Sequence, residues 1–189
     1  MEQPELKTER LILRPFVEAD APRIAELAGD AEVADTTLRI PHPYTSEMAS
    51  EWISTHEAIR DKGRAIFYVI ERKESGELVG STGIDIDLQH SRAEIGYWIG
   101  RKYWNRGYAT EAAARLLGYV FTVLRFHKVT AHCFARNPGS GRVLEKLGMT
   151  RESLLRDHIL KSGAWEDIVQ FGMLETEYEK LETGLQRSG

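Results

Sequence analysis

The sequence predicts a mixed α/β fold in which an antiparallel group of strands comes first and a parallel crossing follows. Short apolar runs alternate with segments whose apolar residues recur every three or four positions, which is the spacing of amphipathic helices. One helical segment, with its apolar stripe at 109–124, lies between two apolar runs, and a connection of that length normally joins parallel strands. No repeat, low-complexity stretch or Pro/Gly-rich linker interrupts the 189 residues, so we expect a single domain over residues 1–189.

The chain should begin with one strand and two helices. Residues 11–16 form a short apolar run that predicts the first strand. Residues 18–30 have helical spacing, and Ser46 is a favourable N-cap for a second helix. The Pro-containing stretch 40–43 predicts a loop between the two helices.

Three antiparallel strands are expected next. Residues 65–72 are rich in Ile, Phe, Tyr and Val, and the turn signal KESG follows at 73–76. Residues 77–87 then complete a hairpin. A second connection at 89–91 leads into another apolar strand at 93–99.

The second half of the chain is dominated by a long helix whose apolar stripe spans 109–124. A glycine after a short helical run is a typical helix terminator, and a short turn between two apolar runs predicts a hairpin. The remaining elements are therefore a strand at 128–134, a helix at 140–147 ended by Gly148, and strands at 149–160 and 164–174 around the turn 161–163.

Composition restricts the class of protein. The chain is 42% hydrophobic and 29% charged with a formal charge of −4, whereas a dedicated nucleic-acid binder carries a basic excess. Its single cysteine, Cys133, allows neither an internal disulfide nor a cysteine-rich zinc site, and we expect no metal. The N-terminus is charged, and no run approaches the ~18 apolar residues of a membrane helix. We therefore expect a cytoplasmic protein with neither a nucleic-acid nor a membrane partner.

The entrance of the long helix, WNRGYAT at 104–110, has no Ser or Asp N-cap where the periodicity begins. Its first amides therefore have no obvious partner within the chain. A helix N-terminus with a cation at Arg106, a glycine at Gly107 and a small residue at Ala109 favours a phosphate group. The segment lacks the Gly-Lys-Ser/Thr of a P-loop. A helix that merely begins at a glycine is the alternative interpretation.

The whole chain resembles the GNAT superfamily of acetyl-CoA-dependent N-acetyltransferases, in particular the branch of RimJ/RimL-type ribosomal-protein alanine acetyltransferases. The segments that carry the resemblance run in the family's order from about residue 8 to 175: TERLILRPF, AEIGYWI, YWNRGYATEA, NPGSGRVLEKLGM and GAWEDIVQFGML. The resemblance implies a mixed, mostly antiparallel sheet with a V-shaped splay between its two central parallel strands. It also implies helices on both faces of that sheet, and acetyl-CoA as cosubstrate.

The resemblance further implies where acetyl-CoA binds. The family signature at the helix entrance is Gln/Arg-x-x-Gly-x-Gly/Ala, and here Trp104 replaces its first residue. The pantetheine arm would pair with backbone of Trp98 and Ile99, and Asn137 would contact the same region. The amides that would hold the CoA pyrophosphate are those of Arg106, Gly107, Tyr108, Ala109 and Thr110.

Three residues are candidates for acid–base chemistry. Many relatives use a tyrosine as general acid, but that position is Leu144 here, which cannot donate a proton. Ser140, three residues after Asn137, matches a serine that this branch assigns to the thiolate, although it could instead cap the short helix. Glu94 is a candidate base or an ordinary strand carboxylate. His132 is the second candidate base or a structural histidine.

The resemblance implies direct transfer of the acetyl group to a primary amine in a ternary complex. We expect the acceptor to be a protein N-terminal α-amine. A small-molecule amine such as an antibiotic, a polyamine or an amino-acid derivative is the second possibility. A CoA-binding sensor without turnover is the third, and Leu144 in the tyrosine position favours it. A homodimer is compatible with the superfamily.

Overall fold

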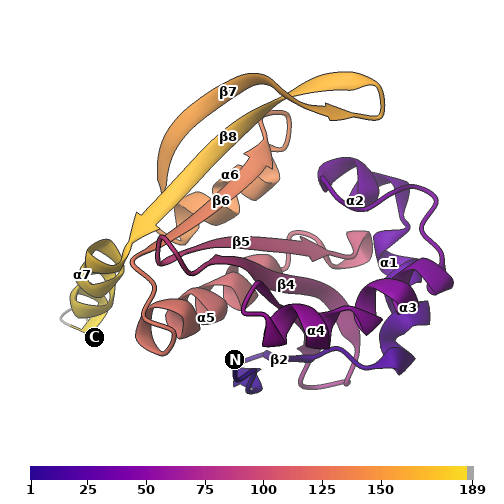
Figure 1. Ribbon diagram of the computed structural model, residues 1–189, viewed down its shortest axis with the longest axis horizontal. Coiled ribbons are helices and arrows are strands. Elements are labelled where there is room, and N and C mark those ends of the chain that lie inside the picture. Colours follow the sequence, from indigo (N-terminus) through magenta and orange to yellow (C-terminus); the bar gives the residue numbers. More distant parts are fainter. Residues whose placement is uncertain (187–189) are drawn as a thin grey trace. The chain divides into compact units, whose positions relative to one another are not determined.

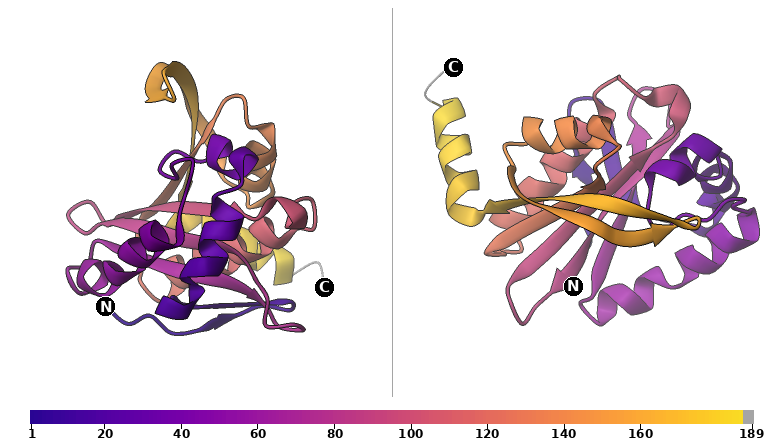
Figure 2. Two further views of the ribbon diagram at one scale, coloured as in Figure 1. Left: turned by 90° about the vertical axis from the view of Figure 1, so that its right-hand side faces the viewer. Right: turned by 90° about the horizontal axis from the view of Figure 1, so that it is seen from above.

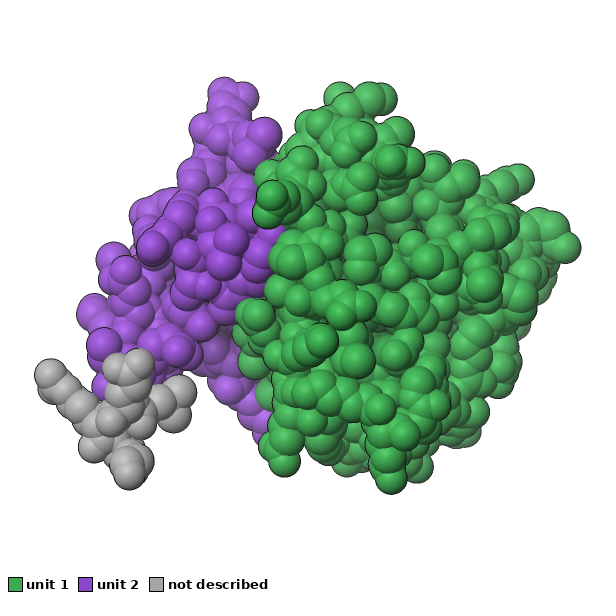
Figure 3. All heavy atoms as spheres, turned by 90° about the horizontal axis from the view of Figure 1, so that it is seen from below, with its two compact units in different colours: residues 1–86, 96–116 green, residues 87–95, 117–189 purple. Residues whose placement is uncertain are grey.

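The computed structural model of the protein describes residues 1–186, and its helices and strands follow one another as Figure 1 shows. The chain forms two compact units, coloured separately in Figure 3. Unit 1 contains residues 1–86 and 96–116, and unit 2 contains residues 87–95 and the chain from residue 117 onward. The strand order is β1-β2-β3-β4-β5-β6-β8-β7, and strand β5 (Arg92–Ile99) contributes residues to both units.

Unit 1 contains an antiparallel group of strands in sequence order. These are β1 (Leu6–Lys7), β2 (Leu11–Pro15), β3 (Ala65–Arg72) and β4 (Leu78–Asp87), each paired with the next. The strands β2 to β4 confirm the prediction within one residue at each end. The two-residue strand β1 was not predicted, because a pattern with a period of two needs more than two residues to be seen.

The helices of unit 1 are shorter and more numerous than predicted. The segment 18–30 forms a 3-10 turn, η1 (Glu18–Asp20), followed by α1 (Ala21–Ala28). Helix α2 (Ala31–Thr36) was missed: the side chain of Asp30 caps it, but its six residues are too few to show a periodic stripe. Helices α3 (Ser46–Ser54) and α4 (His56–Asp61) complete the group.

The predicted N-cap of α3 was wrong by one residue. Thr45 occupies the cap, in an extended conformation, and its hydroxyl oxygen accepts from the Met48 amide at 3.3 Å. Ser46 is therefore the first helical residue. Both residues have a capping hydroxyl, so the sequence could not decide which of them has the extended backbone that a cap requires.

The long helix α5 (Tyr108–Thr122) follows the 3-10 turn η2 (Arg101–Tyr103) and runs from unit 1 into unit 2. Its predicted apolar stripe is confirmed, because Ala112, Ala113 and Leu116 are fully buried. Helix α5 thereby places the segment 104–110 at the end of a helix that the core holds in position.

Unit 2 begins with the parallel crossing that the sequence predicts. Strand β6 (Lys128–Phe134) lies parallel to β5, and the paired residues run from Arg92 with Lys128 to Glu94 with Thr130. On its other side β6 pairs antiparallel with β8 (Ala164–Leu174). Strand β8 pairs in turn with β7 (Thr150–Lys161). The sheet is therefore mixed and mostly antiparallel.

The strands β7 and β8 form a long twisted hairpin, which Figure 2 shows from two sides. Its turn residues Ser162 and Gly163 both have positive φ, 50° and 84°, which is the geometry of a two-residue type I′ turn. Helix α6 (Pro138–Lys146) precedes the hairpin and ends near Gly148, whose φ of 80° agrees with the predicted terminator. Helix α7 (Glu175–Gln186) was not predicted. Among the described residues, no helix has the length and apolarity needed to cross a bilayer.

Candidate active site

The corner at the start of α5, residues 104–110, leaves the amides of residues 106–110 unused within residues 1–186. Asn105 and Gly107 have positive φ, 60° and 80°, and turn the chain sharply into the helix. The first helical bond runs from the Glu111 amide to the Gly107 carbonyl oxygen at 3.0 Å. None of the amides of residues 106–110 donates to a group of the described chain. These amides and the helix dipole make the corner suited to an anion.

Glu111 holds this corner against the start of the chain. Its carboxylate accepts from the Thr8 hydroxyl at 2.6 Å, from the Arg10 amide at 2.9 Å and from the Arg10 guanidinium at 2.6 Å. The same guanidinium donates to the Arg106 carbonyl oxygen at 3.0 Å. Burial opposes ionisation of Glu111, but the bonds from Thr8 and Arg10 outweigh it and lower its pKa. Glu111 thus has the structural role that the first turn of a helix favours for a carboxylate.

Gly107 leaves the backbone of this corner accessible. A Cβ added there would meet the Nη2 atom of Arg10 at 3.3 Å and no other atom within 4 Å. Its φ of 80° is also one that side-chain-bearing residues rarely adopt. The glycine therefore satisfies two demands, the turn of the chain and the close approach of a ligand to the main chain.

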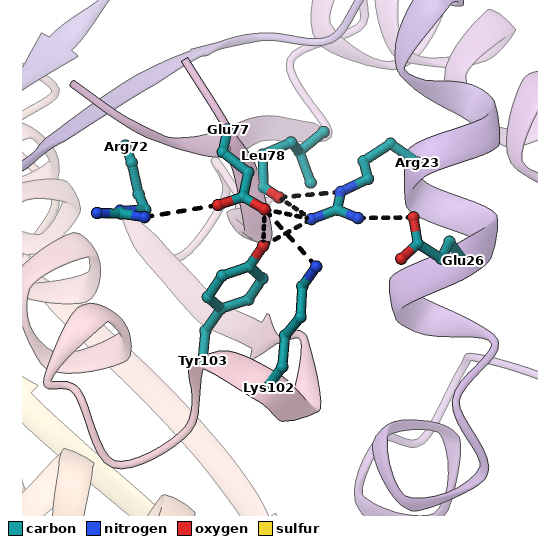
Figure 4. A network of polar contacts seen from close by, with 7 residues as sticks. All are labelled: Arg23, Glu26, Arg72, Glu77, Leu78, Lys102 and Tyr103. Carbon is teal, nitrogen blue, oxygen red and sulfur yellow. Dashed lines mark hydrogen bonds and ion pairs between the residues drawn. The ribbon is translucent and has the colours of Figure 1, made fainter. Parts of the chain in front are cut away.

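A polar network fixes the turn that leads into the corner (Figure 4). The Tyr103 hydroxyl donates to Glu77 and accepts from Arg23 at 2.6 Å, and Arg23 reaches Glu77 at 3.0 Å. Arg72 and Lys102 lie 3.5 and 3.6 Å from the same carboxylate. The hydrogen bond from Tyr103 and the three cations lower the pKa of Glu77, although burial opposes them. No spacing in the sequence indicates that these five residues meet.

This network also supports the cation of the corner. The Arg106 guanidinium lies over the Tyr103 ring, with its carbon 5.8 Å from the ring centroid. Such an arrangement stabilises a cation by roughly 0.5–1 kcal/mol at an exposed site. Next to it, the indole of Trp104 donates to the Ile99 carbonyl oxygen at 2.6 Å. Trp104, which replaces the usual first residue of the family signature, therefore holds the last carbonyl group of β5 in place.

The backbone of β5 at Trp98 and Ile99 faces two different directions. A Cβ added to Gly80 of β4 would lie 2.3 Å from the Trp98 carbonyl oxygen, so that oxygen is directed at β4. The Ile99 carbonyl oxygen is held by Trp104, as described above. Because backbone groups alternate along a strand, the Ile99 amide is on the edge away from β4. Of the two predicted residues, Ile99 therefore has the amide that is better placed for a ligand at this edge.

In unit 2, Asn137 and Ser140 mark the start of α6. The Asn137 side-chain oxygen accepts from the Ser140 amide at 3.1 Å, so Asn137 is the N-cap. The alternative that Ser140 caps this helix is thereby wrong. Cys133 on β6 is buried, and burial raises the pKa of its thiol against the effect of Arg151 and of a hydrogen bond with Ser140. The Ser140 hydroxyl is thus directed at Cys133.

Unit 2 also brings the two candidate bases together. Glu94 is paired with Thr130 in the register of β5 and β6, two residues from His132. The Nδ1 atom of His132 lies 3.0 Å from Oε1 of Glu94, and their side chains are 29% and 39% exposed. Sequence analysis predicted two separate candidates, whereas in the structure the two side chains are neighbours. In the described part of the chain, no three His, Cys, Asp or Glu side chains form a group that could hold a metal ion.

Comparison with known proteins agrees with this arrangement. The family model described as an acetyltransferase (GNAT) domain matches residues 10–150. Uncharacterized N-acetyltransferase p20 of Bacillus licheniformis is 34% identical over 174 residues, which cover 92% of this chain and 97% of that protein. The chain therefore belongs to the GNAT family of acetyltransferases and is an acyltransferase enzyme, and acetyl-CoA is the acetyl donor of this family.

Two further similarities concern the ribosomal branch. The [ribosomal protein uS5]-alanine N-acetyltransferase of Escherichia coli (strain K12) is 25% identical over 170 residues, 87% of each chain. The solved structure of RimL, a ribosomal L7/L12 alpha-N-protein acetyltransferase in complex with coenzyme A, has a TM-score of 0.83. It is 18% identical and covers 90% of this chain and 98% of its own. This second likeness confirms the GNAT fold.

Proposed function

We propose that this enzyme transfers the acetyl group of acetyl-CoA to the N-terminal α-amine of a protein. The observation that carries the donor half is the set of unused amides at residues 106–110. A diphosphate needs several donors that converge on one point, and these amides and the Arg106 guanidinium supply them. The open position at Gly107 allows a phosphate oxygen to reach the main chain.

In this proposal the pantetheine arm pairs with backbone of β5 at Trp98 and Ile99, and the Asn137 amide group contacts the same arm. The Asn137 side-chain oxygen is engaged as the cap of α6, so its NH₂ group is the part that remains to donate. Main-chain bonds of this kind hold the donor in a fixed direction. Fixing the two substrates relative to each other supplies most of the rate in such a reaction.

The chemistry needs one base and one acid. The acceptor arrives as an ammonium ion, and Glu94 or His132 removes one proton. The neutral nitrogen then attacks the thioester carbonyl carbon, a C–N bond forms, and the C–S bond breaks. The leaving thiolate takes the Ser140 hydroxyl proton, and the second proton of the attacking nitrogen restores that hydroxyl. Ser140 takes the role of general acid because Leu144 cannot donate.

The proposal that the acceptor amine belongs to a protein is supported by similarity to known proteins. A relative that is similar over 87% of both chains is named as an alanine N-acetyltransferase of ribosomal protein uS5, so its acceptor is a protein. An α-amine also suits the proposed chemistry, because its pKa of about 7.7–8.0 is lower than the value of about 10.4 for a lysine amine. A modest base can therefore deprotonate it near neutral pH.

The proposal is tested by measuring release of CoA from acetyl-CoA with a panel of amines. The panel contains peptides that begin with alanine or serine, the same peptides blocked at the N-terminus but with a free lysine, and a polyamine. We expect turnover with the free N-termini and little with the blocked peptides. Preference for the polyamine would assign the enzyme to small-molecule amines. Binding of CoA without turnover of any amine would make the chain a sensor and overturn the proposal.

A further inference from the structure

A row of polar side chains crosses the sheet of unit 2 on the face that α6 does not cover. Helix α6 covers the face that carries Cys133, because a Cβ on Gly141 of α6 would lie 4.0 Å from the ring of Phe171, whose partner in β6 is Ala131, on the same face as Cys133. His132 precedes Cys133 in β6, so it lies on the opposite face. Glu94 is beside it on β5, and Gln170 is directly opposite on β8.

The geometry of Glu94 and His132 gives the imidazole a defined orientation. A carboxylate 3.0 Å from Nδ1 favours the tautomer that carries its proton on Nδ1. The second nitrogen, Nε2, then has the lone pair. Within residues 1–186, no group is hydrogen-bonded to Nε2, and the side chain is 29% exposed. The pair therefore presents one proton-accepting atom to a ligand.

Two other charged side chains on this face form an ion pair with each other. On β6, Lys128 lies 2.5 Å from Glu152 of β7. The Glu152 carboxylate lies over Gly172 of β8, where a Cβ would come within 2.4 Å of it. Gln170, opposite His132, is neutral and accepts from the Ser153 hydroxyl at 3.0 Å. Glu94, 3.0 Å from Nδ1, is therefore the carboxylate that can orient the imidazole.

We propose that His132, through Nε2, is the proton acceptor of the reaction and that Glu94 is a positioning residue that orients the imidazole. This rests on the proposed function. An ammonium group of the acceptor passes one proton to Nε2, which leaves a neutral nitrogen for attack and an imidazolium that Glu94 stabilises. The imidazolium returns that proton to solvent after the product leaves. An imidazole suits this step because its ordinary pKa is near neutral, whereas an ordinary carboxylate is a weaker base by about two pKa units.

The assignment predicts different effects for the two residues. His132→Gln removes the base and should lower kcat/KM by about 10²- to 10⁴-fold near neutral pH. It should also abolish the loss of activity on the acidic side of the pH profile. Glu94→Gln keeps an oxygen that can accept from Nδ1, so it should retain that acidic limb and most of the activity. Glu94→Leu cannot accept, and it should lose more activity than Glu94→Gln.

The experiment measures kcat/KM from about pH 5 to 9 with the best acceptor of the amine panel, together with the Kd of acetyl-CoA for each variant. Glu152→Gln is the matched control, because it removes a carboxylate from the same face without touching the pair. An acidic limb that survives in His132→Gln and disappears in Glu94→Gln would make Glu94 the base and overturn the assignment. Full activity of His132→Gln would also overturn it. Wild-type protein that turns over no amine overturns the proposed function and this assignment together.

Discussion

The proposal that the corner at residues 106–110 binds the diphosphate of acetyl-CoA can be tested by removing one backbone N–H group rather than a side chain. Ala109 is the second residue of α5, and Ala109→Pro removes its N–H while keeping a helical φ. The chain already tolerates proline at this position of a helix, because Pro22 is the second residue of α1. The Ala109 amide has no partner within residues 1–186, so its removal breaks no internal hydrogen bond.

The expected loss of affinity follows from one charge-assisted hydrogen bond. Such a bond contributes roughly 1.5–3 kcal/mol, so the Kd of acetyl-CoA should rise by about 10- to 150-fold. Isothermal titration calorimetry measures this directly, and Ala109→Ser is the control because it keeps the amide. Thermal unfolding of both variants without ligand checks that the fold is retained. A folded Ala109→Pro variant with the wild-type Kd would refute the assignment of this corner to the diphosphate.

The remaining predictions concern three other positions. Gly107→Val should raise the Kd of acetyl-CoA by at least tenfold, because the new side chain blocks the approach of a phosphate to the main chain. Gly76→Val is the control, because Gly76 also has positive φ and a Cβ there would meet no atom within 4 Å. Both substitutions should lower the free energy of unfolding by roughly 1–2 kcal/mol through backbone strain, but only Gly107→Val should weaken binding. Ser140→Ala should lower kcat by about 10²-fold or more and leave the Kd of acetyl-CoA unchanged, because Asn137 still caps α6; a variant with full kcat would remove Ser140 from the chemistry. Burial lowers the pKa of His56 to about 4 from 6.5, and both of its ring nitrogens are buried without a hydrogen-bond partner in the described chain. Between pH 6.5 and about pH 4, His56 therefore binds a proton in the unfolded chain but not in the folded chain. Its contribution to the free energy of unfolding is complete above pH 6.5 and falls by about 2 kcal/mol towards pH 4, after allowance for the partial exposure of the side chain. His56→Phe should flatten that fall in urea titrations at pH 7.5 and 5, and an equally steep fall would contradict this account.

The parts of the fold that the sequence predicts well are those with long periodic patterns. Helix α5 and strands β3, β6 and β8 were predicted within a residue or two, because each presents a long buried face. Helix α2 and strand β1 were missed, because six and two residues are too few for a pattern. The exact cap of α3 depends on which of two neighbouring hydroxyl residues has an extended backbone, and that is a tertiary property.

The candidate site likewise has one part that the sequence predicts and another part that it does not. The unused amides of the corner could be predicted, since they follow from the absence of a cap at a helix start. The contact between Glu94 and His132 could not, because it depends on the register of two strands that 28 residues of sequence separate, from residue 100 to 127. The network of Glu77 and Tyr103 is similar: charged residues on separate elements carry no sequence signal of their meeting.

The replacement of the usual tyrosine by leucine has a physical explanation in helix α6. Leu144 is fully buried, so a tyrosine with the same orientation would have to bury a hydroxyl and find it a partner. Ser140 lies one turn earlier on the same helix, is partly exposed, and already has its amide held by Asn137. A short side chain on a capped first turn has few rotamers to lose, so it can hold a hydroxyl in place at low entropic cost. In the proposed mechanism the acid can therefore be Ser140 instead of a tyrosine at position 144 without a change in the fold, and the core of unit 2 gains an apolar side chain at Leu144.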